Sequence, residues 1–212
     1  MQVTIIGTGN MGRGIGTRAL AGGHSVRLID KDPAKAKTLA DELRQRVGGD
    51  VAESGSTAVG EADLVVLALP FPAGKEVAAG YHEQLAGKTV VDICNPVDFA
   101  TFDSLVVPPG TSAAEQIAAA APGARVVKAF NTTFAGNLVA AQGGGATLDV
   151  FIAGDDAAAK QAVTDLAASS GMRPIDVGPL RRARELEGMQ FLHMTLQQTL
   201  GTNWSSAIKI LG

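Results

Sequence analysis

Three glycines near the start of the chain have the spacing of a phosphate-binding turn. Gly7, Gly9 and Gly12 form the pattern G-x-G-x-x-G directly after an apolar, β-branched run, Val3 to Ile6. In this pattern the first glycine permits a tight turn, the second lets a pyrophosphate approach the backbone, and the third lets the next helix pack against the sheet. The phosphates would meet the N–H groups at the start of that helix. The expected dinucleotide loop comprises Gly7, Thr8, Gly9, Asn10, Met11 and Gly12.

A second expected strand ends in a carboxylate where such a loop requires one. Val26 to Ile29 is followed by Asp30, about 20 residues beyond the loop. An acidic side chain at this place binds the 2′-hydroxyl of an NAD ribose and repels the 2′-phosphate of NADP. Lys31 and Lys35 lie close by in the sequence and could still hold a phosphate. The residues therefore leave both NAD(H) and NADP(H) open.

The carboxyl ends of the later strands supply the other candidate site residues. Ligands of an open α/β sheet bind outside these ends, so the segments that follow the strands should line one crevice. Leu69 with Pro70, and the run Asn95 to Val97, are expected to reach the nicotinamide half of the dinucleotide. Asn131 and Thr132 are expected to face the molecule that exchanges a hydride with it.

No side chain stands out as a catalytic acid or base. His24 and His82 are expected on the surface, and His193 lies beside the apolar stripe of a C-terminal helix, where packing or a subunit contact is a better interpretation than proton donation. Cys94 is expected to be a small buried hydrophobe, and no residue cluster has metal-ligand spacing. Hydride transfer between a nicotinamide and a flavin-like ring needs no strong protein acid or base, because the ring nitrogens handle the proton.

Apolar strands alternate with helical segments over most of the chain, which predicts βαβ units and a parallel sheet. The fully apolar run Leu64 to Leu69 is typical of a strand buried on both faces. The fold class is therefore α/β, a Rossmann-type doubly wound sheet with a small C-terminal helical extension. Further strands are expected at 50–53, 89–93, 126–130, 148–153 and 174–177, and helices at 14–22, 33–47, 73–86, 112–121, 134–142 and 155–169.

The C-terminal part of the chain differs from the rest in its pattern. Seven apolar residues recur three or four positions apart between Leu180 and Leu200, which predicts one apolar stripe on a helix of about six turns. A short amphipathic helix is expected over Asn203 to Leu211. Such a unit would cover the crevice or contact a second subunit. We therefore divide the chain into a dinucleotide-binding domain, 1–178, and a helical segment, 179–212.

Composition and charge exclude several other classes of protein. Apolar residues make up 46% of the 212 residues and charged residues 18%, which indicates a folded protein with a sizeable core. The net charge of −3 and the lack of a basic patch give no reason to expect nucleic acid or a membrane surface as a partner. Because the chain enters its first expected strand at once, no signal peptide is expected, and a single cysteine suits a reducing cytoplasm.

Six segments, in order, resemble one known family. They are GTGNMGRGIGTRALAGGHSV, LALPFPA, SAAEQIA, VVKAFNT, VFIAGDD and RPIDVGPLRRARELE. The set is similar to the NADP-dependent coenzyme F420 oxidoreductases and to the cytosolic domain of STEAP-type metalloreductases. The resemblance implies a Rossmann domain with a small helical part used for dimerisation, and hydride transfer between NADP(H) and F420 or a flavin.

The resemblance also implies roles for individual residues. Thr8 to Met11 match the pyrophosphate loop, and Leu69 with Pro70 match the segment beside the ribose and nicotinamide. Near the nicotinamide and the deazaflavin, the matching residues are Asn95, Pro96, Val97, Asn131 and Thr132.

The chain departs from the family pattern in two places. The F420 enzymes typically have Ser-Arg-Arg after the second strand, whereas this chain has Asp30-Lys31-Asp32. The motif Lys128-Ala129-Phe130-Asn131 resembles the flavin-linked metalloreductases as much as the F420 enzymes.

Three hypotheses follow from the sequence. The first is a cytoplasmic, homodimeric oxidoreductase that passes hydride between NADP(H) or NAD(H) and F420 or a flavin. The second is a reductase of a small carbonyl or imine compound, with His193 as the proton donor. The third is a dinucleotide-binding module without turnover.

Overall fold

An eight-stranded sheet runs through the centre of the molecule. The computed structural model describes residues 1–211, and the strand order is β10-β9-β6-β5-β4-β1-β2-β3. Neighbouring strands are parallel except for β6 and β9, which are antiparallel. The strands are β1 Gln2–Ile6, β2 Ser25–Ile29, β3 Val51–Glu53, β4 Leu64–Leu67, β5 Thr89–Asp92, β6 Arg125–Lys128, β9 Asp149–Gly154 and β10 Arg173–Gly178. A separate hairpin joins β7 Gln142–Gly143 to β8 Ala146–Thr147. The Rossmann-type sheet predicted from the alternating pattern is confirmed.

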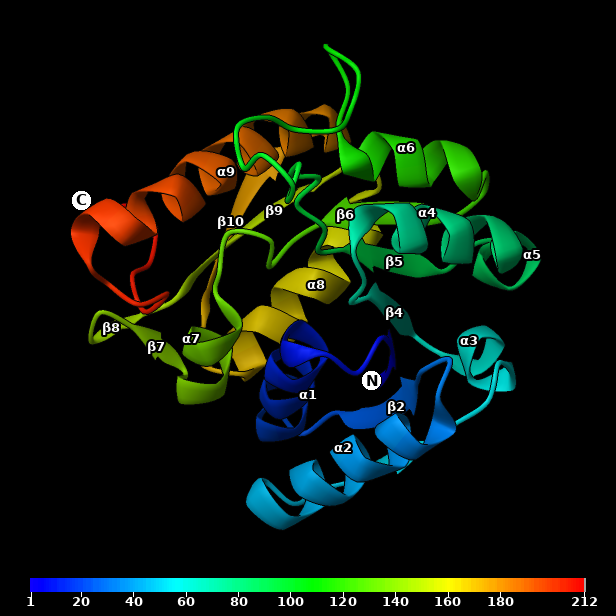
Figure 1. Ribbon diagram of the computed structural model, residues 1–212. Coiled ribbons are helices and arrows are strands. Elements are labelled where there is room, and N and C mark those ends of the chain that lie inside the picture. The colour runs from blue at the N-terminus through cyan, green and yellow to red at the C-terminus, as the bar shows by residue number, and fades with distance from the viewer. Residues whose placement is uncertain (212) are drawn as a thin grey trace.

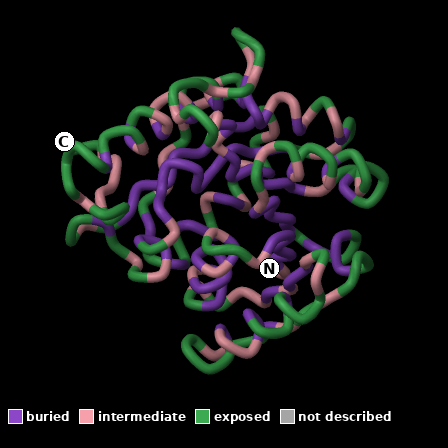
Figure 2. Tube along the Cα trace, viewed as in Figure 1, coloured by how far each residue is buried: buried purple, intermediate pink, exposed green. Residues whose placement is uncertain are grey.

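Helices cover both faces of the sheet (Figure 1). One face packs against α1 Asn10–Ala21, α2 Pro33–Arg46, α7 Ala135–Ala140 and α8 Ala157–Ser169. The other packs against α3 Thr57–Glu61, α4 Phe71–Gly80, α5 His82–Leu85 and α6 Ala113–Ala120, with the 3-10 turn η1 Leu180–Arg182 and the start of α9 Ala183–Leu200. Buried residues, drawn in purple, are concentrated in the centre of the molecule, between the sheet and these helices (Figure 2).

The strands are apolar on both sides because both sides are covered. In β4, Leu64 and Val66 belong to one core and Val65 and Leu67 to the other, and none of the four is exposed to solvent. This two-sided burial explains why the sequence shows a continuous apolar run instead of an alternating one.

Two helices differ from the expectation for residues 57–86. The single helix expected over 73–86 is two helices, α4 and α5, which meet at Tyr81. α4 begins earlier, at Phe71, because Pro72 in its first turn needs no hydrogen-bond partner for its nitrogen. The short helix α3 was not predicted, because five residues are too few to show a helical period.

The helix predicted between Leu180 and Leu200 is present as α9, but the short helix predicted over Asn203 to Leu211 is wrong. Residues 205–211 have no regular secondary structure. Asn203 and Trp204 have positive φ angles of 47° and 61°, so the chain turns away from a helical path after α9. The apolar stripe is buried only at its start, because Leu186 is 4% exposed whereas Leu192 is 61% exposed.

Asp149, on β9, holds the C-terminal segment 205–211 against the sheet. Its carboxylate accepts hydrogen bonds from Arg173 Nε at 2.8 Å, Lys209 Nζ at 3.1 Å and the backbone N–H of Ile210 at 2.9 Å. Burial acts to raise the pKa of Asp149, but these hydrogen bonds outweigh burial and hold the pKa at about 2. The segment is thus fixed by an ionised side chain about 60 residues earlier in the sequence.

We expect Asp149→Asn to lower the free energy of unfolding at pH 7 by about 1–2 kcal/mol, because it weakens charge-assisted hydrogen bonds. The pKa of Asp149 is lower in the folded than in the unfolded protein, so its contribution is complete above pH 4 and is lost as the pH falls toward 2. Urea unfolding of the wild type and the variant should therefore differ at pH 7 and converge toward pH 2. An equal difference at both pH values would contradict this assignment.

Candidate functional site

A cleft of about 300 Å³ lies at the carboxyl ends of β1, β4 and β5. The loop after β1 lines one side of it, and the ends of β4 and β5 line the other. Its lining residues are Gly9, Asn10, Met11, Ala68, Leu69, Pro70, Ile93, Cys94, Asn95, Phe99 and Met194. The structure thus brings together Leu69, Pro70, Asn95 and part of the predicted loop, and it adds Phe99 and Met194, which the sequence analysis did not identify.

The glycine loop leaves open space at only one of its three glycines. A Cβ at Gly7, which has φ +107°, would lie 2.4 Å from Ala68 O, and a Cβ at Gly12 would lie 2.1 Å from Gly7 O. A Cβ at Gly9 would meet no protein atom within 4 Å. Gly7 and Gly12 are therefore required by close packing, whereas the space at Gly9 is free for a ligand.

The first turn of α1 is available to an anion. Gly9 is the N-cap residue of α1, and no side chain caps the helix. Free N–H groups and the positive end of the helix dipole favour a phosphate at this place. The loop therefore has the geometry that a pyrophosphate site needs, and pyrophosphate binding stays a prediction for these residues.

Asp30 braces this loop from the end of β2. One carboxylate oxygen accepts from Thr8 N at 3.1 Å and Thr8 Oγ at 2.6 Å, and the other accepts from Asp32 N at 3.1 Å. Burial acts to raise the pKa of Asp30, but these hydrogen bonds and the nearby Lys35 outweigh it and lower the pKa. Asp30 is therefore an ionised carboxylate that already has partners within the protein.

A second cavity, of about 280 Å³, lies on the other side of Thr8 between the loop and α2. Its lining residues are Thr8, Arg13, Ala34, Lys35, Thr38, Leu39 and Glu42. Arg13 pairs with Glu42 at 3.0 Å, whereas Lys31 and Lys35 are exposed. The cavity is placed to receive the adenosine half of a dinucleotide bound at the loop.

Two asparagines join the ends of β5 and β6. Asn131 Nδ2 donates to Asn95 Oδ1 at 3.0 Å and Asn95 Nδ2 donates to Asn131 O at 2.9 Å. Phe130, just before Asn131, is 1% exposed and has a φ of 62°, a strained conformation for a bulky residue. The tertiary structure therefore imposes the path of the chain at this point.

The predicted substrate-side residues lie behind the cleft surface. Pro96, Val97, Asn131 and Thr132 are all buried. They support the wall that carries Asn95, and direct contact with a substrate stays a prediction for them.

His193 does not line the cleft. It is 8% exposed, its ring nitrogens lie 3.1 Å from Gln190 Oε1 and 2.8 Å from Ser206 Oγ, and its ring packs against Phe134 with centroids 4.7 Å apart. Burial lowers the pKa of His193. The geometry agrees with the packing role that the sequence favoured over proton donation.

Cys94 lines the cleft but its thiol is covered. The residue is 2% exposed, and its Sγ donates to Leu69 O at 3.2 Å. Burial raises the pKa of this thiol well above its ordinary value. Cys94 is thus the small buried residue expected from the sequence.

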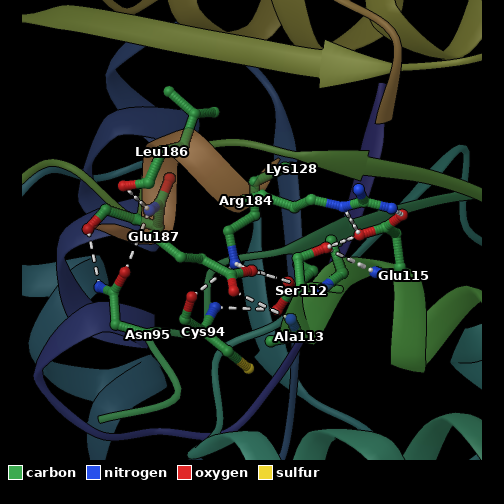
Figure 3. A network of polar contacts seen from close by, with 12 residues as sticks. Cys94, Asn95, Ser112, Ala113, Glu115, Lys128, Arg184, Leu186 and Glu187 are labelled. Atoms are coloured by element: carbon green, nitrogen blue, oxygen red, sulfur yellow. Dashed lines mark hydrogen bonds and ion pairs between the residues drawn. The ribbon is translucent and has the colours of Figure 1, made fainter. Parts of the chain in front are cut away.

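A buried charge cluster behind the cleft was missed by the sequence analysis (Figure 3). Lys128 Nζ lies 2.8 Å from Asp92 Oδ2 and 2.8 Å from Glu187 Oε1, and it also donates to Cys94 O. The Lys128 and Asp92 side chains are 0% exposed and that of Glu187 is 1% exposed. The sequence signal for this cluster was Lys128 in the expected strand 126–130, which is otherwise apolar. Because lysine is almost never buried without charged partners, its position indicates that carboxylates lie nearby.

A further cavity lies next to the cleft, and the described residues include neither a metal-binding group nor a membrane-spanning helix. A cavity of about 340 Å³ adjoins the cleft at Met194, which lines both, and it also contains Phe102 and Trp204. Within residues 1–211, no group of three or more His, Cys, Asp or Glu side chains is arranged to hold a metal ion. No helix in that range is long and apolar enough to cross a membrane.

The profile of the family described as NADP oxidoreductase, coenzyme F420-dependent, matches residues 2–96. An F420-dependent NADP reductase from Methanocaldococcus jannaschii is 31% identical over 199 residues, which cover 89% of each protein. This chain belongs to the F420-dependent NADP reductase family. The resemblance noted in the sequence is therefore confirmed.

Other proteins similar to this chain include a second type of reductase and several solved structures. The chain is 31% identical to the metalloreductase STEAP3 of Rattus norvegicus over 89% of its own length, but it spans only 36% of that protein. A candidate F420-dependent NADP reductase from Arthrobacter sp. FB24 superposes with a TM-score of 0.84, at 31% identity over 99% of both chains. An imine reductase from Streptomyces aurantiacus, at 22% identity and a TM-score of 0.66, shares the fold.

The glycine loop gives a matched pair of variants. We expect Gly9→Ala to leave the melting temperature unchanged but to weaken NADPH binding at least about tenfold, because its methyl group enters the ligand space. Gly12→Ala should instead destabilise the protein by about 2 kcal/mol, because its methyl group meets a backbone oxygen. Thermal unfolding and fluorescence titration with NADPH would measure both effects. Equal effects of the two substitutions on stability would refute the distinction.

Proposed function

We propose that this chain transfers a hydride between NADP(H) and coenzyme F420. The observation that carries the proposal is the cleft itself, which starts at the dinucleotide loop and ends at Asn95, Phe99 and Met194. Among its lining residues only Cys94 carries a titratable side chain, and that thiol is buried. A cleft without an acid or base suits direct ring-to-ring transfer.

The chain's own residues bind and orient the two reactants. The N–H groups of the first turn of α1 would hold the pyrophosphate, and Leu69, Pro70 and Asn95 would flank the nicotinamide. Bound NADPH would supply the hydride and F420 would accept it. Phe99 and Met194 would exclude water from the acceptor end, and the cavity beyond Met194 offers room for the rest of the acceptor.

The names of the relatives support NADP as the nucleotide. Asp30 is engaged by Thr8 and Asp32, so its carboxylate acts within the protein as a brace for the loop. Lys31 and Lys35 are exposed next to it and fit a 2′-phosphate. We therefore place the 2′-phosphate with these two lysines, and we retain NADH as the alternative to be tested.

Absorbance assays with NADPH or NADH, and with F420 or FMN, test the proposed function directly. We expect NADPH oxidation with F420, a lower rate with NADH, and no comparable rate with FMN. His193→Ala should keep more than about a tenth of kcat, because a true proton donor contributes about 10²- to 10⁴-fold. NADPH binding without F420 reduction would reject the proposal and direct attention to carbonyl and imine acceptors. A rate with FMN alone would favour a flavin reductase.

We also propose that two copies of the chain associate through α9. Leu192, Leu196 and Leu200 are 61%, 38% and 58% exposed, and they lie one turn apart on one side of the helix. A row of exposed leucines of this kind marks a protein contact. The proposal keeps 1–178 as the dinucleotide-binding domain and 179–212 as the contact segment, in a reducing cytoplasm that suits the free Cys94.

We expect the double variant Leu192→Glu, Leu196→Glu to sediment as a monomer under conditions in which the wild type sediments as a dimer, because the charges oppose burial of this helix surface. Val106→Glu, at a residue that is 51% exposed in the loop 98–111, is the control and should stay dimeric. A monomeric wild type, or a dimer in the leucine variant, would refute the proposed contact.

A further inference from the structure

We infer that Lys128 and Glu187 are positioning residues that hold two walls of the cleft in a fixed relation and so set the geometry of hydride transfer. The inference rests on the proposed function for its catalytic consequence. The buried cluster of Lys128, Asp92 and Glu187 connects the backbone next to Asn95 with the helix α9, which carries Met194 (Figure 3).

On the sheet side, the cluster binds both peptide groups of one residue. Asp92 Oδ1 accepts from Cys94 N at 2.8 Å, and Lys128 Nζ donates to Cys94 O. The next residue is Asn95, which lines the cleft. The position of Asn95 therefore depends on where Lys128 and Asp92 hold the preceding residue.

On the helix side, Glu187 connects three elements. Its Oε1 accepts from Lys128 Nζ at 2.8 Å, and its Oε2 accepts from Ala113 N at 2.9 Å in the first turn of α6. Met194 follows Glu187 by seven residues, about two turns later on the same side of α9. The hydrogen bonds of Glu187 thus fix the position of α9 along its axis and its rotation about that axis, and with them the place at which Met194 lines the cleft.

Stability alone does not explain this arrangement. Two carboxylates and one ammonium bear a formal charge of −1 when all are ionised, and buried ion pairs are often no more stable than apolar residues of equal volume. Burial raises the pKa of Glu187. Burial acts to lower the pKa of Lys128, but the neighbouring carboxylates of Asp92 and Glu187 outweigh it and raise that pKa. What apolar side chains could not supply is the set of directed bonds to Cys94, Ala113 and Ala114.

The first test compares Glu187→Gln with Arg184→Gln. Glu187→Gln leaves the Asp92–Lys128 pair in place but weakens the connection to α9. Arg184→Gln breaks the ion pair between α9 and α6, where Arg184 Nη2 lies 2.6 Å from Glu115 Oε1, and leaves Cys94 untouched. We expect Glu187→Gln to lower kcat for F420 reduction about tenfold with the KM for NADPH within about twofold, because a misplaced reactant costs rate while the nucleotide loop is intact. Arg184→Gln should change neither value more than about twofold.

Glu187→Asp separates position from charge. It keeps the charge of the cluster, and therefore the fold, but withdraws the carboxylate by one methylene group. If Glu187 acts by position, Glu187→Asp also lowers kcat. A wild-type kcat in Glu187→Asp, or an equal loss in Arg184→Gln, would overturn the inference.

Hydrogen–deuterium exchange tests the connection without any acceptor. We expect Glu187→Gln to speed exchange at the amide of Cys94 and across residues 190–194 at least about tenfold, with α2 unchanged as an internal control. Unchanged exchange at Cys94 would overturn the inference even if kcat fell. If the wild type does not reduce F420, the proposed function fails, whereas the exchange result still decides whether Lys128 and Glu187 connect the two walls.

Discussion

A lysine ammonium held between two carboxylates in the interior is the constraint on which the far half of the cleft depends. Lys128 on β6 contacts Asp92 at the end of β5 and Glu187 on α9. Removing one partner of such a buried pair costs about 3–5 kcal/mol, because a charge is left without compensation. This is a large part of the 5–15 kcal/mol that typically stabilises a domain. β5, β6 and α9 therefore cannot shift independently.

The near half of the cleft is fixed by close steric contact, in addition to the hydrogen bonds from Thr8 to the Asp30 carboxylate. Gly12 approaches Gly7 O, and Gly7 approaches Ala68 O, so closely that any side chain would collide with backbone atoms. The two halves thus respond differently to mutation. Added volume at Gly7 or Gly12 disturbs the loop, whereas a lost charge at Lys128 or its partners disturbs the wall behind Asn95.

Local features were predictable from the sequence. The strands β1, β2, β4 and β5 and the loop after β1 were placed to within about two residues, because β-branched runs and glycine spacing act through neighbours in the sequence. The segment 205–211 was predicted to be helical because its apolar residues have a helical period. The side chains of Asp149 and Asn137 bind its backbone, and they lie 61 and 69 residues away in the sequence, so no local pattern reveals them.

The same limit explains why the charge cluster was missed. The partners of Lys128 lie 36 and 59 residues away, and a lysine in an apolar strand does not name them. On α9 the apolar stripe predicted the helix itself but not its orientation. The residues that it turns inward after Leu186 are polar, namely Glu187, Gln190, His193 and Gln197.

This orientation of α9 connects the cleft to the outer surface of the molecule. The inward polar side chains have partners within the protein: Gln190 lies 3.1 Å from His193, and Gln197 donates to Ser206 at 2.9 Å. The outward leucines are only partly buried, whereas full burial of a leucine side chain contributes about 1.5–3 kcal/mol. Because hydrogen bonds already fix the inner side, an apolar partner on the outer side would add stability without rotating the helix. Met194 lies on the same side of α9 as Glu187 and lines the cleft, so the way in which the inner side of α9 is held sets the position of this part of the cleft wall.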